Sequence, residues 1–526
     1  MENKLLKSLG EAAKLQQAGR SSDAQIIYDQ IIKSHSSDSS HKNMDALIAI
    51  AHNNLGFIFQ RNTSLHHEAL EHYRLASELN PKYCEAHYNL GHVLHSLGDL
   101  KEAIECYGRV VAIEPKNVDA LNTLGSALSS NGDLASAVKV FKQALEINPS
   151  IAELHNNLGS ALLSLGKLNA AAASFKTAIK LKPEYVNGFN NLGHVFREQG
   201  NLEGAMENYE QALKSDPNLL QTHNSIGNLL RQEKKYEEAL SSFEYINNQI
   251  SKSDSFGDPS SEEYWFNAKS QALECLYILG RYKELKDELA SLSESHQLNR
   301  RLAAISCFVS HQLEIPDNHT FCRNPLDYIH FGSLDTHVAD VAGFLEELIV
   351  DGMKEKQVWE PRHGVTKSGY LTANTIFKAS DAYARLEEVL RSEITSYCEK
   401  FDVEACKYIK HWPRAYFLKG WLNRLLAKGH QRSHIHPGGW LSGCVYLKTV
   451  ESKVTSHGAI KFGLHGYDLP LIKEMPQERT YSPRPGDIVL FPSSLFHSTI
   501  PFTEEVERYS IAFDLYPQIK QMSDCD

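Results

Sequence analysis

Three histidines near the C-terminus have the spacing of a metal site. His434 and His436 are two residues apart, so on an extended strand both side chains project from one face. His497 follows 61 residues after His436, beside another segment with the composition of a strand. Two imidazoles on one face can chelate a metal ion, and a third can complete the set. Three imidazoles suit zinc, copper and nickel as well as iron.

A cation and a hydroxyl follow this third histidine. In the segment ERYSIAFDL, Arg508 and Ser510 are again two residues apart and lie on one face of a strand. A guanidinium and a hydroxyl together form a fork that matches a carboxylate. We expect this strand to pair as a hairpin with the one that carries His497.

Further side chains share the face of His436. Trp440, Ser442 and Tyr446 lie at even spacing from it, so they are expected to face the same interior. Ser442 is predicted to contact a bound cofactor or substrate, because a buried hydroxyl needs a hydrogen-bond partner. Packing of a barrel interior explains Trp440 and Tyr446 equally well.

The elements that must position these residues are short strands covered by helices. Apolar residues at helical spacing predict helices near residues 336–353 and 379–401. Runs rich in β-branched and aromatic residues, separated by Gly, Pro and polar turns, predict strands over 443–450, 458–464, 486–493 and 508–517. This pattern favours an antiparallel barrel or jelly roll.

The order of these motifs resembles one enzyme family. HxH, PGDxxxFPSxLxH and ERxSIAF, with CRNPLDYIHF and TKSGYLTANTIF upstream, are similar to the 2-oxoglutarate/iron oxygenases that are often fused to tetratricopeptide repeats, over about residues 320–517. The resemblance implies a double-stranded β-helix (jelly-roll, cupin-like) fold and Fe(II) bound by His434, His436 and His497 as catalytic residues. It also implies that Arg508 and Ser510 bind 2-oxoglutarate, with dioxygen as co-substrate.

The middle histidine departs from the commonest ligand set. That set is two histidines and a carboxylate, written HxD…H, whereas this chain has His436 in the middle position. Either three histidines bind the metal, or His434 or His436 lies outside the ligand set while water or another carboxylate completes it. The choice of iron over zinc also rests on the resemblance.

The N-terminal half repeats with a period of 34 residues. Prolines and glycines recur at this interval, at Pro81, Pro115, Pro149, Pro183 and Pro217 and at Gly91, Gly125, Gly159, Gly193 and Gly227. This is the length of a tetratricopeptide repeat, a pair of helices that stacks on its neighbours. Five or six such repeats over about 49–250 resemble that family and predict an all-α superhelix.

A polar ladder runs through the first helix of the repeats. Four of its members are asparagines that precede a Leu-Gly step: Asn54, Asn89, Asn157 and Asn191. The units resemble the repeats of O-linked N-acetylglucosamine transferases, whose asparagines bind the backbone of an extended peptide. By that resemblance these four bind a protein or peptide partner; alternatively, asparagine is simply tolerated on a solvated face.

Composition excludes several classes of function. The formal charge of -11, without a cluster of Lys and Arg, argues against nucleic-acid binding. No stretch is long and apolar enough for a membrane anchor, and the start resembles no signal peptide. Nine cysteines without a CxxC pair fit free thiols in a reducing compartment, so we expect a cytoplasmic protein.

We therefore predict four segments: a degenerate N-terminal repeat or cap (1–48), tetratricopeptide repeats (49–250), a linker with a terminal helical pair (251–315) and an oxygenase domain (316–526). The predicted function is a 2-oxoglutarate-dependent dioxygenase, a hydroxylase whose repeats recruit a protein or peptide substrate. The alternative is an adaptor in which the repeats bind partners and the β domain is catalytically silent. The substrate is not readable from the sequence, because specificity lies in variable loops.

Overall fold

The computed structural model describes residues 2–34, 42–61, 65–252, 259–292, 296, 298–360, 365–401, 406–475 and 478–518. They fall into two units, Met1–Ser225 and Ile226–Asp526. None of the described helices is sufficiently long and apolar to span a membrane.

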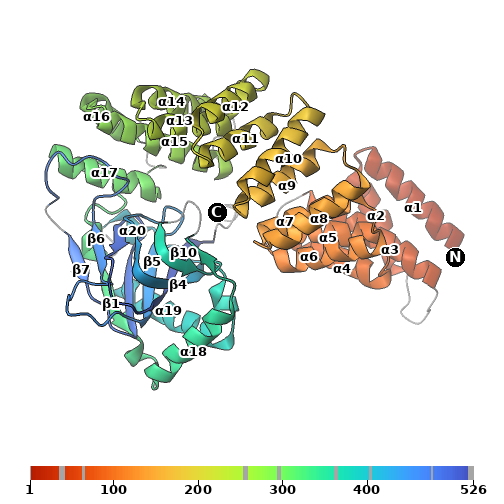
Figure 1. The fold of residues 1–526 in the computed structure, drawn as a ribbon. Coiled ribbons are helices and arrows are strands. Elements are labelled where there is room, and N and C mark those ends of the chain that lie inside the picture. Colours follow the sequence, from red (N-terminus) through yellow and green to blue (C-terminus); the bar gives the residue numbers. More distant parts are fainter. Residues whose placement is uncertain are drawn as a thin grey trace. The chain divides into compact units, whose positions relative to one another are not determined.

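The first unit is a run of helices that pack as successive pairs (Figure 1). They are α1 (Glu2–Gln17), α2 (Ser21–Lys33), α3 (Lys42–Gln60), α4 (His66–Leu79), α5 (Cys84–Ser96), α6 (Leu100–Ile113), α7 (Val118–Ser130), α8 (Leu134–Ile147), α9 (Ala152–Ser164), α10 (Leu168–Leu181), α11 (Val186–Glu198) and α12 (Leu202–Ser215). The predicted array of helical repeats is confirmed.

The repeated glycine allows close packing within a pair. A Cβ added to Gly125 in α7 would lie 2.6 Å from Cε1 of Phe141 in α8, which is buried. The aromatic ring therefore packs directly on the backbone of the facing helix. Glycine recurs every 34 residues because the ring leaves no room for a side chain at this position.

Replacing Gly125 by alanine is expected to destabilise the repeats by about 1–3 kcal/mol, the usual cost of overpacking. The matched control is Gly108→Ala in α6, where an added Cβ meets nothing within 4 Å. That change should stabilise by up to about 1 kcal/mol through helix propensity. Urea unfolding followed by circular dichroism measures both, and equal effects would contradict the packing argument.

The second unit begins with helices and continues into the β domain. Its helices are α13 (Leu220–Gln232, which spans the boundary), α14 (Tyr236–Lys252), α15 (Pro259–Ile278), α16 (Tyr282–Ala290), α17 (Arg300–Leu313), α18 (Val341–Lys354), α19 (Asp381–Lys400) and α20 (Lys407–Lys410). The sequence predicted α15 and α16 as a terminal pair but not α17. The predicted boundaries at 48, 250 and 315 stay predictions.

Two antiparallel sheets form the β domain. The strands are β1 (His330–Ser333), β2 (Val358–Trp359), β3 (Thr366–Leu371), β4 (Tyr416–Gln431), β5 (Leu441–Lys448), β6 (Ile460–Gly463), β7 (Arg479–Tyr481), β8 (Asp487–Pro492), β9 (Phe496–Thr499) and β10 (Arg508–Pro517). The seven-stranded sheet has the order β1-β8-β5-β10-β4-β3-β2, and the three-stranded sheet has the order β7-β6-β9. The predicted helices and strands of this domain are confirmed, and the predicted hairpin is wrong, because β9 pairs with β6 while β10 pairs with β4 and β5.

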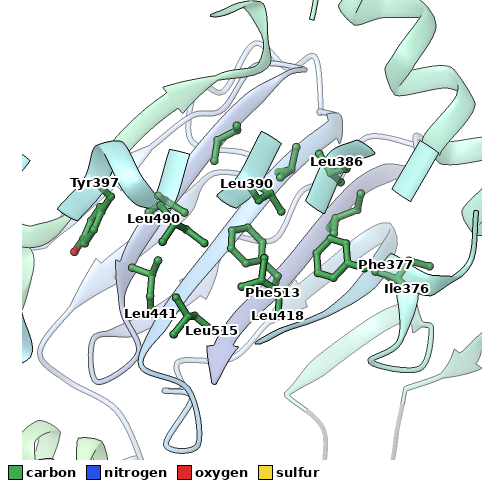
Figure 2. Close-up of a cluster of buried hydrophobic side chains, with 14 of the residues drawn as sticks. Ile376, Phe377, Leu386, Leu390, Tyr397, Leu418, Leu441, Leu490, Phe513 and Leu515 are labelled. Carbon is green, nitrogen blue, oxygen red and sulfur yellow. The ribbon is translucent and has the colours of Figure 1, made fainter. Parts of the chain in front are cut away.

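One face of the large sheet is covered by helices. Figure 2 shows Leu386 and Leu390 of α19 above Leu490 of β8 and Phe513 of β10, and all four belong to one buried apolar cluster. The other face points toward the small sheet. Strand β5 illustrates the alternation, because Val445 belongs to the helix-covered cluster whereas Tyr446 packs with Phe462 of the small sheet.

Candidate metal centre and carboxylate site

The three histidines meet between the two sheets. His434 lies in the segment between β4 and β5 and forms an isolated antiparallel bridge with His497 of β9, with both N–O distances 3.0 Å. The backbone nitrogen of His436 donates to the carbonyl of Ser493 at 3.0 Å. The expectation that His434 and His436 lie on a regular strand is wrong, since β4 ends at Gln431 and β5 begins at Leu441. Pairing with the β8–β9 segment positions them instead.

The imidazoles converge on a common point. One ring nitrogen from each of His434, His436 and His497 lies within 4.8 Å of the other two, which is compatible with a single metal ion. The centroid of the His434 ring is 5.0 Å from that of His436 and 4.2 Å from that of His497.

Contacts at Nδ1 leave each Nε2 as the ring atom that could bind a metal ion. Nδ1 of His434 faces the carbonyl of Arg432 at 2.7 Å, and Nδ1 of His497 faces that of Leu495 at 3.1 Å. Nδ1 of His436 lies 2.8 Å from the Asp514 carboxylate. Because these partners only accept, the neutral rings carry their proton on Nδ1 and present a lone pair at Nε2.

Two of these lone pairs face each other closely. Nε2 of His434 and Nε2 of His436 are 3.1 Å apart. Without a proton between them this arrangement is repulsive, and a cation bound by both relieves the repulsion. Both nitrogens thus fit a shared metal ion, which supports the ligand set of three histidines.

Burial keeps two of the rings neutral. Removal from water, reinforced by the neighbouring His436, lowers the pKa of His434 to about 3. Burial likewise holds the pKa of His497 well below its ordinary value, and His434 and His436 lower it further. Neutral imidazoles are the form that binds metal, so the ligands are ready at neutral pH.

Asp514 is the functional residue that the sequence analysis missed. Its buried carboxylate accepts from Nδ1 of His436, and Ser442 donates to it at 2.7 Å. Such a carboxylate fixes the ring orientation of a metal ligand and raises its basicity. Its even spacing from Arg508 on β10 was an available signal. Asp514 places a negative charge next to the site, where the commoner ligand set has a coordinated carboxylate.

Ser442 belongs to the hydrogen-bond network around Asp514. Its hydroxyl contacts Asp514 and lies 2.8 Å from Oγ of Ser493, across the pair β5–β8. This geometry supports a role in holding Asp514. Direct contact of Ser442 with the cofactor stays a prediction.

Arg508 and Ser510 lie on the same cavity. Arg508 is 3% exposed; its Nε donates to the carbonyl of Gly458 at 3.1 Å and one terminal nitrogen donates to Ser510 at 3.3 Å. Within the described ranges no Asp or Glu pairs with this guanidinium. A buried charge is costly unless it is paired, so this cavity suits an anionic ligand.

Tyr446 supplies a second unmet polar group. Its hydroxyl is buried and has no hydrogen-bond partner among the described residues, and the Arg508 guanidinium lies 5.0 Å from the centre of its ring. Tyr446 and Ser510 are register partners across β5 and β10. A carboxylate held by Arg508 is thus placed to accept from this hydroxyl.

The three imidazoles and the Arg508 guanidinium line one cavity. It is lined by Trp421, Gln431, His434, His436, Ser442, Gly443, Cys444, Tyr446, Ile460, Phe491, His497, Thr499, Arg508, Ser510 and Ala512. Trp440, predicted to face the same interior, instead belongs to the cluster under the helices and donates to the carbonyl of Tyr408.

The asparagine ladder links neighbouring repeats. The side-chain nitrogens of Asn89, Asn157 and Asn191 donate to asparagine oxygens of the preceding repeat at 3.0, 2.9 and 2.9 Å, and that of Asn54 donates to the Tyr28 hydroxyl at 3.1 Å. This explains the ladder in part as an inter-repeat contact. Binding of a partner by these residues stays a prediction.

Comparison with known proteins agrees with both parts. The family model described as "Putative 2OG-Fe(II) oxygenase" matches residues 419–514. Models of the tetratricopeptide repeat match residues 66–98, 91–132 and 193–232, and residues 122–186. The chain thus carries tetratricopeptide repeats and an oxygenase domain of the double-stranded β-helix class. No curated protein matches the chain.

Several solved structures are similar to part of this chain. A tetratricopeptide repeat protein from Parabacteroides merdae is 16% identical (TM-score 0.41, 51% of this chain and 99% of that chain). MamA from Desulfovibrio magneticus is 21% identical (TM-score 0.31, 32% and 96%). YrrB, described as a repeat protein with an unusual peptide-binding site, is 22% identical (TM-score 0.31, 37% and 95%).

Proposed function

We propose that this chain, which carries tetratricopeptide repeats followed by a 2OG-Fe(II) oxygenase domain, is an Fe(II)- and 2-oxoglutarate-dependent dioxygenase that acts as a hydroxylase. The observation that carries the proposal is the meeting, in one cavity, of three convergent imidazole nitrogens with a buried guanidinium that lacks an anionic partner. A metal ion and an anionic ligand together complete this site.

The residues have distinct tasks in this proposal. His434, His436 and His497 would hold Fe(II), with Asp514 orienting His436. Arg508, Ser510 and Tyr446 would bind the distal carboxylate of 2-oxoglutarate. When bound, Fe(II) and 2-oxoglutarate supply the activation of dioxygen, and 2-oxoglutarate ends as succinate and carbon dioxide.

The repeats are proposed to recruit a protein or peptide substrate. Asn54 and Asn89 line a hollow in the first unit, together with Phe57 and Tyr88. Half-buried amides beside aromatic rings suit the backbone and side chains of an extended peptide. We further propose a cytoplasmic location, since the eight described cysteines are free thiols.

Anaerobic titration of Fe(II) and 2-oxoglutarate into the metal-free protein tests the enzyme proposal. A chelated 2-oxo acid on Fe(II) gives a visible charge-transfer band, which we expect to saturate with one equivalent of each. Metal binding without the band would favour the alternative, a silent module on a repeat-based adaptor.

Tyr446→Phe is expected to raise KM for 2-oxoglutarate about tenfold, equivalent to about 1.4 kcal/mol, because a hydrogen bond to a charged group is lost. The thermal stability of the metal-free protein should not fall, since the removed hydroxyl has no hydrogen-bond partner among the described residues. Tyr481→Phe is the matched control: its hydroxyl donates to Asp487 at 2.6 Å outside the cavity. It should lower stability and leave KM unchanged, and the reverse pattern would refute the role of Tyr446.

A further inference from the structure

Helix α17 precedes the oxygenase domain and lies outside the residues matched by the family model. It begins at Arg300, after Asn299, whose side chain accepts from the backbone nitrogens of Arg301 and Leu302 at 3.0 Å each. This cap fixes the first turn of the helix and thereby the backbone positions of Arg300 and Arg301. The two arginines make different contacts.

Arg300 holds the segment that follows His436. Its Nε donates to the carbonyl of Pro437 at 3.0 Å, and one terminal nitrogen donates to that of Gly438 at 3.2 Å. The other terminal nitrogen donates to the carbonyl of Leu298 at 3.1 Å, which anchors the guanidinium to the segment just before α17. Because a guanidinium is planar and rigid, these hydrogen bonds restrain the backbone next to His436.

The next turn of α17 packs against the two segments that carry the three histidines. Ala304 forms a small buried cluster with Ile435 and Phe496. Ile435 stands between His434 and His436, and Phe496 directly precedes His497. A shift of this helix would therefore displace the backbone next to all three histidines.

Arg301, the next residue of α17, ties this helix to other helices. The carboxylate of Glu274 in α15, 1% exposed, accepts from Arg301 at 3.3 Å and from Arg231 of α13 at 2.5 Å. The Arg301 guanidinium also lies 5.1 Å from the ring centre of Tyr467, which packs edge-on against Phe496. A buried carboxylate between two guanidiniums is costly to separate, so α17 is firmly held.

We infer that α17 positions the metal centre and that Arg300 is the positioning residue, holding the segment 432–440 in the conformation that directs His434 and His436 toward the metal. The inference rests on the proposed metal site. The alternative is that α17 only covers apolar side chains and has no effect on metal affinity.

The test compares Arg300→Gln, Arg300→Lys and the control Arg281→Gln in the full chain. Arg281 forms ion pairs with Glu237 and Glu284 away from the cavity, so its loss removes comparable hydrogen bonds without touching the segment. Co(II) titration, followed by visible absorption, gives the metal Kd. Hydrogen exchange of the metal-free protein reports the order of residues 432–440.

Arg300→Gln should weaken Co(II) binding about 10- to 100-fold, the usual effect of losing an outer-shell partner, and should speed exchange at 432–440. Arg300→Lys should give a Co(II) Kd and an exchange rate between those of the parent and those of Arg300→Gln, because a single ammonium cannot span both carbonyls. It replaces Arg300→Gln in the comparison if that variant folds poorly. Arg281→Gln should match the parent in both measurements.

An unchanged Kd and unchanged exchange in a folded Arg300 variant would overturn the inference and leave α17 as a cover. A parent that binds no Co(II) would instead refute the proposed metal site. The exchange measurement, which needs no metal, then decides alone whether Arg300 holds the segment.

Discussion

His497→Ala is expected to weaken metal binding on the order of 100- to 1000-fold and to abolish turnover of 2-oxoglutarate. Four-ligand zinc sites bind with about 10–16 kcal/mol, so one ligand accounts for roughly 3–4 kcal/mol. No water readily replaces this ligand, because His497 is buried between Phe491 and His434. Calorimetric titration with Co(II) and an assay of succinate release measure the two effects.

His155→Ala provides the control for the histidine substitution. His155 lies in α9, and its Nε2 contacts the carbonyl of Pro149 at 2.9 Å, so its loss should alter neither measurement. Retention of parental metal affinity by His497→Ala would exclude His497 from the ligand set. The same result for His434→Ala would exclude His434 from the ligand set and favour a set that water or a carboxylate completes.

Arg508→Ala is expected to raise KM for 2-oxoglutarate on the order of 100-fold while metal affinity stays close to that of the parent. Charge-assisted hydrogen bonds are each worth about 1.5–3 kcal/mol, and a guanidinium supplies two to a carboxylate. The distal carboxylate would then enter a buried site without a counter-charge. Loss of the charge-transfer band at 2-oxoglutarate concentrations that saturate the parent, with Co(II) binding intact, is the expected signature.

Arg424→Ala is the matched control for Arg508. Arg424 lies on β4 beside β10 and pairs with Glu507 at 2.5 Å at the partly exposed rim of the sheet. Its removal takes away one arginine next to the same strand without opening the cavity. A similar rise in KM for both variants would show that Arg508 acts through the stability of β10 rather than by binding the carboxylate.

His497→Ala and Arg508→Ala distinguish binding of the metal from binding of 2-oxoglutarate. The histidine variant should lose metal and, with it, the 2-oxo acid chelated to the metal. The arginine variant should lose only the 2-oxo acid. If the parent shows neither the charge-transfer band nor succinate release, the β domain is silent and the function lies in the repeats.

The sequence by itself determined the features that depend on local spacing. The 34-residue recurrence of glycine predicted the helical pairs, because each glycine meets an aromatic ring of its own repeat, as Gly125 meets Phe141. The alternation along residues 508–517 predicted that Arg508 and Ser510 share a face, since side chains on a strand alternate between its two faces. The three histidines were also found from their spacing and motif context.

Only the tertiary structure decided how these pieces meet. His436 and Asp514 are 78 residues apart, and Arg300 lies 137 residues from Pro437, so no local pattern predicted either contact. The segment of His434 and His436 is not a regular strand; its conformation depends on backbone bonds to Ser493 and His497 and on α17. Such contacts follow from sheet order and packing, which bring distant residues together without leaving a period in the sequence.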